Sequence, residues 1–317
     1  MKYRKLGEAM VSEIGFGTWG IGGLTEGASS YGPTNDSVSK AAIRTALDQG
    51  INFFDTANLY GDGHAEELIG EVLQRDNWRK KVVIATKGGL LKYWGGNDLS
   101  RENLRNSLIG SLQRLRTDYV DIYQLYNPPM EMLTQEVIET LKEFKKDGLI
   151  KDFGLSLKSP QLGLEAIDLG FKILQVNFNM IDQRACDCGL LNKAKEEGVN
   201  LIARTPFCFG FLTGKIINLD FHTRDHRSAW DKTQLEKWLE ASKMFDRLNE
   251  GTNRSLSILA LKFCLAPEAV SCVIPGIQTP TEALENAAAA NWPDLTSEEI
   301  NTIGDIYGQN NFHVKAT

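Results

Sequence analysis

The chain has 317 residues, of which 42% are hydrophobic and 24% are charged, so it can bury a sizeable core and is not a disordered protein. Its 35 basic and 41 acidic side chains give a net charge of −6, which provides no basic field for nucleic acid. It has no apolar run of the about 18 residues that a membrane helix needs, and residues 1–6 lack the apolar stretch of a signal peptide. We therefore expect a cytoplasmic protein that binds neither nucleic acid nor membranes.

The spacing of cysteine and histidine predicts neither disulfides nor a metal site. An odd number of cysteines without a Cys-x-x-Cys pair fits no disulfide framework and no zinc site, so we expect reduced thiols. His222 and His226 have the i, i+4 spacing of a helix face, but this pair lacks a third ligand. The cysteines are Cys186, Cys188, Cys208, Cys264 and Cys272.

Eight short runs rich in Val, Ile, Phe or Tyr recur along the chain, each followed by a stretch with helical spacing of apolar residues. The runs cover residues 14–19, 51–56, 82–87, 119–126, 150–156, 173–178, 200–205 and 271–276. The amphipathic stretches include residues 39–49, 65–74, 101–116, 135–146 and 184–197. This alternation, without a Pro-, Gly- or Ser-rich linker, predicts an α/β protein with one domain, a (β/α)8 TIM barrel over residues 1–317.

Two additions to the eight units are predicted. Residues 3–6 and 11–12 can form a β-hairpin that plugs the bottom of the barrel. About 70 residues separate the starts of the seventh and eighth strands, so this connection carries an insertion at about residues 211–250. Because long excursions from compact domains are more often functional than idle, we interpret the insertion as a lid.

The segment Gly15-x-Gly17-x-x-Gly20 matches the phosphate-binding loop of a Rossmann fold, but its context does not. A Rossmann turn leads directly into a helix whose N-terminus faces the pyrophosphate. Residues 21–33 are rich in Gly, Ser and Thr and are typical of a loop. We therefore reject a Rossmann fold.

Polar side chains gather at the predicted ends of the strands, where the active site of a β/α barrel lies. Tyr60 follows the second strand by a few residues. The others are Asp55, Lys87, Tyr126, Ser156, Gln175 and Arg204-Thr205-Pro206. So many polar groups on one face of a barrel indicate catalysis.

A Tyr, a Lys and an Asp at one barrel mouth have a specific chemical use. A free phenol has a pKa near 10, so an adjacent ammonium is needed to favour its ionised form. Lys87 supplies that charge, and Asp55 holds the ammonium in place, which leaves Tyr60 able to give a proton to a developing alkoxide. The arrangement predicts reduction of a carbonyl group.

Six motifs resemble those of the aldo-keto reductases, and in particular the branch that includes potassium-channel β subunits. They are Asp55-Thr56-Ala57-x-x-Tyr60-Gly61, Thr86-Lys87-Gly88, Gly154-x-Ser156, Gln175-x-Asn177-x-Asn179, Pro206-x-x-x-Gly210-x-Leu212-Thr213-Gly214-Lys215 and Val273-Ile274-Pro275-Gly276. The resemblance spans residues 3 to about 290. It implies a (β/α)8 barrel that binds NAD(P)H and that reduces an aldehyde or ketone to the alcohol.

The resemblance assigns Asp55, Tyr60 and Lys87 to three members of the catalytic tetrad, with Tyr60 as the general acid. Tyr126 stands where the family usually has a histidine. One interpretation is that its phenol replaces the imidazole donor; losing such a donor costs about 10²- to 10³-fold in rate. The alternatives are a reductase of conjugated enones, or a catalytically weak nucleotide-binding regulatory protein.

The resemblance also implies a cofactor site. Ser156 and Gln175 would bind the nicotinamide carboxamide, and Arg204 would pack on the ring. The segment over the pyrophosphate and its flank comprises Thr205, Pro206, Gly210, Leu212, Gly214 and Lys215. The nucleotide contacts are completed by Trp19, Gly276, Gln278, Glu282 and Asn286, the last at the adenine.

Gln278 and Glu282 depart from relatives that carry Arg and Gln there. Loss of the Arg weakens the preference for a 2′-phosphate, and Glu282 suits a ribose hydroxyl. Because the resemblance still favours NADP(H), we expect NADP(H), with NAD(H) as the alternative. The predicted partner is a small-molecule carbonyl compound, such as a sugar or a flat apolar carbonyl, and a monomer and a homo-oligomer both stay open. Its pocket would be lined by Trp19, Tyr93-Trp94, Tyr126, Phe207 and Phe209.

Overall fold

The computed structural model describes residues 1–24, 30–75, 77–93 and 95–314. Trp94, expected in the substrate pocket, lies outside the described residues, as does part of the predicted loop 21–33.

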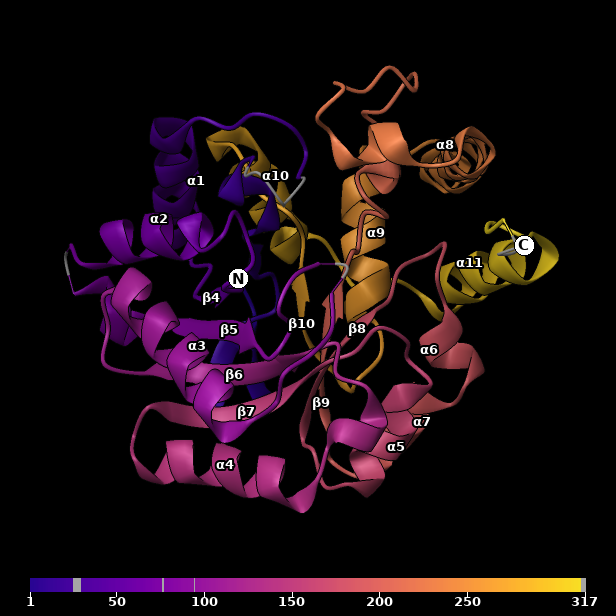
Figure 1. Ribbon diagram of the computed structural model, residues 1–317. Coiled ribbons are helices and arrows are strands. Elements are labelled where there is room, and N and C mark those ends of the chain that lie inside the picture. The colour runs from indigo at the N-terminus through magenta and orange to yellow at the C-terminus, as the bar shows by residue number, and fades with distance from the viewer. Residues whose placement is uncertain (25–29, 76, 94, 315–317) are drawn as a thin grey trace.

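Eight parallel strands form the barrel, and all eight predicted strands are confirmed (Figure 1). They are β3 (Phe16–Gly17), β4 (Phe53–Asp55), β5 (Val83–Gly88), β6 (Val120–Tyr126), β7 (Ile150–Ser156), β8 (Ile173–Asn177), β9 (Asn200–Arg204) and β10 (Val270–Ile274). Each pairs with the next in chain order. The last gap is closed because Gly15 N donates to Val273 O at 2.8 Å and Gly17 N donates to Pro275 O at 2.9 Å. The fold is the predicted (β/α)8 barrel.

Gly15 and Gly17 have a structural purpose at this closure. A Cβ on Gly17 would lie 2.9 Å from Pro275 O, and one on Gly15 would lie 2.9 Å from the Cys272 Sγ. Only a residue without a side chain lets the first strand approach the last so closely. A short 3-10 turn, Trp19–Gly22, follows, and the first α-helix begins at Asp36, so the rejection of a Rossmann fold is confirmed.

The N-terminal hairpin closes the bottom of the barrel as predicted. Strands β1 (Tyr3–Leu6) and β2 (Ala9–Ser12) pair antiparallel. Leu6 and Val11 are fully buried and pack in one cluster with inward-facing strand residues such as Phe53 and Ile202. The barrel interior is therefore a packed core and not a channel.

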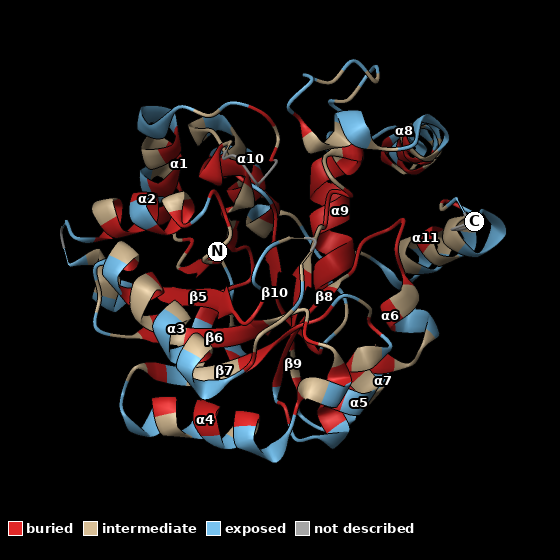
Figure 2. Ribbon diagram, in the orientation of Figure 1, coloured by how far each residue is buried: buried red, intermediate tan, exposed pale blue. Residues whose placement is uncertain are grey.

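Eleven α-helices are described; several bury one face and expose the other, whereas the helix Leu256–Leu265 is buried along its whole length (Figure 2). They are α1 (Asp36–Asp48), α2 (His64–Leu73), α3 (Arg101–Leu115), α4 (Gln135–Lys146), α5 (Leu162–Asp168), α6 (Arg184–Asp187), α7 (Leu190–Glu196), α8 (Lys232–Asp246), α9 (Leu256–Leu265), α10 (Pro280–Ala288) and α11 (Ser297–Gln309). None of the described helices combines the length and the hydropathy that crossing a membrane requires.

The single helix predicted over residues 184–197 is wrong, because the structure contains two helices there. Helix α6 ends at Asp187, and Gly189, with φ of 79°, separates it from α7. A left-handed backbone at Gly189 interrupts the helical hydrogen bonds, and glycine adopts it without a steric penalty.

The insertion after β9 is confirmed. It comprises short 3-10 turns and α8, which contacts α9 and α11 (Figure 1). Its backbone also reaches the loop after β3, because His226 N donates to Ser30 O at 3.0 Å. The insertion therefore connects two loops at the carboxyl ends of the strands, while its action as a lid stays a prediction.

Candidate active site

Lys87, Asp55 and Tyr60 meet at the carboxyl end of the barrel. Lys87 on β5 is fully buried, and its Nζ donates to Asp55 Oδ1 at 2.5 Å and to Tyr60 Oη at 3.2 Å. The Thr56 carbonyl accepts a third hydrogen bond from Nζ at 2.9 Å. The ammonium therefore has all three of its protons directed by the protein, one of them at the Tyr60 phenol.

Gln124 and Gln175 fix the other oxygen of Asp55. Gln175 Nε2 donates to Asp55 Oδ2 at 2.6 Å, and Gln124 Nε2 donates to it at 3.2 Å. Ser156 Oγ in turn donates to Gln175 Oε1 at 3.2 Å. Gln124 was not predicted as a site residue, although it is a buried polar residue on a barrel strand, in register with Lys87. Both oxygens of Asp55 are thus hydrogen-bonded, which compensates its burial.

The Tyr60 phenol is held in its protonated form. Burial raises its pKa well above the usual value near 10, and the Asp55 charge raises it further; Tyr126 and Arg204 lower it by less. A phenol with a raised pKa releases its proton readily only to a strong base, and the hydrogen bond from the Lys87 ammonium stabilises the phenolate that results. A developing alkoxide is such a base.

Tyr126 ends β6 and stands beside Tyr60, as the sequence predicts. The two rings meet edge to face, with centroids 6.4 Å apart and planes at 86°. Burial, followed by the neighbouring Tyr60, raises the pKa of Tyr126, so this phenol is also protonated. Asn97 Nδ2 donates to the Tyr126 carbonyl at 2.8 Å and ties the loop after β5 to the end of β6.

Two further aromatic residues stand at the mouth beside these tyrosines. Trp19 Nε1 donates to Tyr93 Oη at 3.1 Å, which joins the loops after β3 and β5. Burial raises the pKa of Tyr93, and Tyr126 and Tyr60 add to the rise, which places its phenol near theirs. Trp19, Tyr93 and Tyr126 thus lie at the same end of the barrel, while their role as walls of a substrate pocket stays a prediction.

Arg204 ends β9 and reaches across the end of β8. Its Nη2 donates to the Leu157 carbonyl, next to Ser156, at 2.9 Å. Its Nε is buried and has no hydrogen-bond partner among the described residues. The guanidinium thus lies at the barrel mouth with an unused donor.

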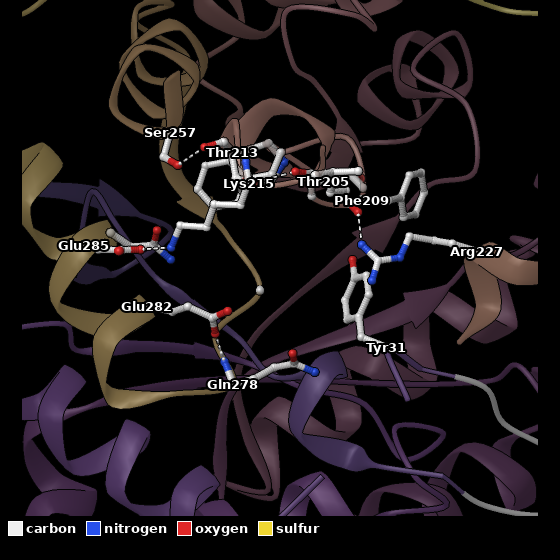
Figure 3. A pocket seen from close by; sticks show the side chains of 16 residues that line it. Tyr31, Thr205, Phe209, Thr213, Lys215, Arg227, Ser257, Gln278, Glu282 and Glu285 are labelled. Atoms are coloured by element: carbon white, nitrogen blue, oxygen red, sulfur yellow. Dashed lines mark hydrogen bonds and ion pairs between the residues drawn. The ribbon is translucent and has the colours of Figure 1, made fainter. Parts of the chain in front are cut away.

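A pocket beside the mouth brings together eight of the predicted cofactor residues (Figure 3). These are Thr205, Pro206, Gly210, Lys215, Gly276, Gln278, Glu282 and Asn286. Two other predicted cofactor residues do not line the pocket: Leu212 is fully buried, and Gly214 is a turn residue with a left-handed backbone. The remaining four, Trp19, Ser156, Gln175 and Arg204, lie at the barrel mouth. Eight lining residues were not predicted for the cofactor: Tyr31, Phe207, Phe209, Thr213, Ile216, Arg227, Ser257 and Glu285. Phe207 and Phe209 line this pocket, and their predicted part in a substrate pocket stays a prediction.

Two features show that the pocket fits the adenosine end of a dinucleotide. Asn286 Nδ2 is buried without a hydrogen-bond partner among the described residues, so it can donate to a ring nitrogen of a base. At Gly276 the nearest atom to an added Cβ is Tyr31 Cε2 at 4.0 Å, which leaves open space against the backbone. The residues present are thus compatible with a nucleotide cofactor.

The two basic side chains that line this pocket are paired with carboxylates. Lys215 forms an ion pair with Glu285 on one side, and Arg227 lies with Tyr31 on the other (Figure 3). Arg227 Nη2 donates to Asp225 Oδ2 at 2.6 Å. Both basic side chains of the lining therefore already have carboxylate partners.

Glu282 has a structural role that was not predicted from the sequence. Its Oε2 accepts from Gln278 N at 2.7 Å and from Thr279 N at 3.1 Å, as part of a capping box at the start of α10. Gln278 Nε2 donates to Gly20 O at 3.1 Å. The signal was present as Thr279-x-x-Glu282, the spacing of a capping box. One oxygen of Glu282 is thus committed to the helix.

No group of His, Cys, Asp and Glu side chains in the described part of the chain is arranged to hold a metal ion. The five cysteines are free thiols, and Cys208, Cys264 and Cys272 are buried.

Comparison with known proteins identifies the family. The model of the aldo/keto reductase family matches residues 13–307, so the chain belongs to this family and is an oxidoreductase. It is 30% identical to aldo-keto reductase YhdN of Bacillus subtilis (strain 168), over 96% of this chain and 93% of the relative. It is 29% identical to a probable voltage-gated potassium channel subunit beta of Oryza sativa subsp. japonica, over 96% of this chain and 95% of that one. Its fold superimposes on glycerol dehydrogenase AKR11B4 of Gluconobacter oxydans with a TM-score of 0.81, 27% identity and coverage of 99% and 97%. Members of the family use NADP(H) or NAD(H).

Proposed function

We propose that this protein reduces an aldehyde or a ketone to the alcohol with NAD(P)H, and that Tyr60 is the proton donor. The observation that carries the proposal is the position of Lys87 Nζ, within hydrogen-bond distance of both Asp55 and Tyr60. An oxidoreductase of this family needs an acid where negative charge develops on the substrate oxygen. Tyr60 is the hydroxyl that accepts a hydrogen bond from this buried cation, at 3.2 Å.

The chain's own residues hold and move one proton. The nicotinamide supplies a hydride to the carbonyl carbon when the cofactor is bound. Tyr60 gives its proton to the oxygen, and Lys87 stabilises the phenolate that forms. Asp55, held by Gln124 and Gln175, keeps the ammonium in place. Ser156 and Gln175 are the proposed partners of the nicotinamide carboxamide.

Tyr126 takes the place of the family's histidine as a second donor to the carbonyl oxygen. Its phenol is neutral and adjoins Tyr60, so it can orient the oxygen without competing as an acid. Trp19, Tyr93 and Tyr126 form aromatic walls that suit a flat carbonyl compound or a sugar ring. We propose a small molecule of this kind as the substrate.

The paired charges of the nucleotide pocket bear on the choice of cofactor. The resemblance puts NADP(H) first, but Lys215 and Arg227 have carboxylate partners and Gln278 is uncharged. The 2′-phosphate of NADP(H) would therefore meet no basic side chain in this lining that lacks a carboxylate partner. We propose that NAD(H) is accepted at least as well as NADP(H).

Two observations favour alternatives. The replacement of the family's histidine by Tyr126 favours reduction of a conjugated enone. In that reaction the carbonyl oxygen does not require the hydrogen bond that the histidine would donate. The similarity to the potassium channel subunit favours a regulatory nucleotide-binding protein with weak turnover.

The test is the initial rate of NADH and NADPH oxidation with a reactive aromatic aldehyde and with an enone, beside a binding titration of each cofactor. Turnover of the aldehyde at about 1 s⁻¹ or more supports the proposal. In that case Tyr60→Phe should lower kcat by at least about 10²-fold and leave the cofactor Kd unchanged, because only the proton is lost. The control is Tyr3→Phe, which removes a hydroxyl on the exposed N-terminal hairpin. Tight binding without turnover of either substrate would instead support the regulatory alternative.

A further inference from the structure

We propose that Arg204 makes this protein bind reduced nicotinamide cofactor in preference to the oxidised form. The inference rests on the proposed function, because it concerns the same cofactor site. It assigns a task to a side chain whose charge the reduction chemistry above does not use.

The guanidinium of Arg204 lies at the carboxyl ends of β7, β8 and β9. Arg204 is half-buried at the end of β9, in register with Asn177 at the end of β8. Its hydrogen bond to the Leu157 carbonyl carries the side chain across β8 to the end of β7. Ser156 and Gln175, the proposed partners of the carboxamide, end β7 and lie on β8. The guanidinium thus borders the space assigned to the nicotinamide ring.

The positive charge of Arg204 has no ion-pair partner among the described residues. At the mouth, Lys87 is in contact with Asp55, and the charge of Asp62 reaches Tyr93 and raises its pKa. Within the described part of the chain, Arg204 forms no ion pair, and its Nε has no partner at all. Its charge reaches the opposite wall, where it lowers the pKa values of Tyr60 and Tyr126 against the larger effect of burial. Among the described residues, the Arg204 guanidinium is therefore a positive charge without a carboxylate in contact with it.

The two cofactor forms differ in the charge of the nicotinamide ring. The oxidised nicotinamide ring carries one positive charge and the reduced ring carries none. Their ribose, pyrophosphate and adenosine parts are the same, so all other contacts of the protein cancel in a comparison. A neighbouring guanidinium without an ion-pair partner repels the charged oxidised ring and has no such effect on the neutral reduced ring.

The consequence is a protein that stays loaded for reduction. Where both forms are present, the reduced form occupies the site, and the oxidised form leaves readily after turnover. The same charge lowers the driving force of hydride transfer within the complex, so the benefit lies in occupancy and release, and not in the chemical step.

The test measures binding and needs no substrate. NADH and NAD⁺ are titrated separately into the wild-type protein, Arg204→Gln and Arg204→Lys, with intrinsic tryptophan fluorescence or calorimetry as the readout. NADPH and NADP⁺ are used if that pair binds more tightly. Gln is polar but neutral, while Lys keeps the charge. Thermal melts confirm that both variants are folded.

We expect the ratio of the Kd for the oxidised form to the Kd for the reduced form to fall by about tenfold in Arg204→Gln. We expect Arg204→Lys to keep the ratio within about twofold of the wild type. An unchanged ratio in Arg204→Gln, including parallel weakening of both forms, would overturn the inference. An equal fall in both variants would overturn it too, because shape and not charge would then be the cause. Failure of the wild-type protein to bind any of the four nucleotides would overturn the proposed function itself.

Discussion

The ring of Tyr126 stands edge-on to the ring of Tyr60, with 6.4 Å between the centroids and 86° between the planes. Both phenols are raised in pKa by burial, so two neutral hydroxyl donors face one reaction site. Lys87 Nζ touches only one of them, at 3.2 Å from Tyr60 Oη, and lies 5.7 Å from the Tyr126 ring centroid. This asymmetry is the basis for proposing Tyr60 as the proton donor and Tyr126 as the group that orients the substrate.

We expect Tyr126→Phe to lower kcat for a reactive aldehyde by about 10²-fold, because one donor to the developing oxyanion is lost. Tyr126→His should retain activity within about tenfold of the wild type, since the imidazole also donates. Steady-state rates of cofactor oxidation measure both. If Tyr126→Phe turns over like the wild type, the hydroxyl has no part in orienting the substrate.

The buried pair of Lys87 and Asp55 should matter for stability as well as for rate. In Asp55→Asn the fully buried ammonium loses its carboxylate, and an amide NH₂ must face either Lys87 or the donors of Gln124 and Gln175. Breaking a buried ion pair costs about 3–5 kcal/mol in the free energy of unfolding. Urea denaturation followed by circular dichroism measures the change.

The matched control is Lys142→Gln, which breaks the exposed pair with Glu139. Such surface pairs contribute about 0–1 kcal/mol. An unfolding free energy of Asp55→Asn as close to wild type as that of the control would show that the pair is not held as a charged pair.

Sequence reasoning found the catalytic cluster because the barrel rule places strand ends together. Asp55 and Lys87 end neighbouring strands, so their contact follows from the fold alone. Gln124 was not predicted as a site residue, because no local sequence pattern distinguishes a functional polar residue in a buried strand from one that only packs there.

The nucleotide pocket was predicted less completely, for a different physical reason. Tyr31 and Arg227 lie almost 200 residues apart and meet because the insertion pairs with the loop after β3. Neither loop has the periodicity that marks a helix or strand, so the pairing of their backbones is a tertiary effect. Glu282 was interpreted as a ribose ligand, although the capping box of α10 uses one of its oxygens.

Gln278 provides a test of cofactor choice. Gln278→Arg places an unpaired guanidinium in a pocket whose Lys215 and Arg227 already have partners. A charge-assisted hydrogen bond to a 2′-phosphate should raise the affinity for NADPH relative to NADH by about 10- to 150-fold. Binding titrations give the ratio, and Gln49→Arg, which adds the same charge at the exposed end of α1, is the control. Equal gains in both variants would mean that net charge, and not a contact in the pocket, changes the affinity.

The raised pKa of Tyr60 sets the pH dependence of the reaction. Burial, followed by the Asp55 charge, moves this pKa upward from about 10, so the protonated phenol is the dominant form throughout the neutral range. Reduction uses that form, and its kcat should stay level between about pH 6 and 9 as far as Tyr60 is concerned. Oxidation of the alcohol needs the phenolate, so its rate should rise with pH over the same range. Rate profiles in both directions, with Tyr60→Phe as the control that removes the titrating group, measure the two slopes. A reduction rate that falls with an apparent pKa near 7 would show that Tyr60 is not the acid, because its pKa is shifted in the opposite direction.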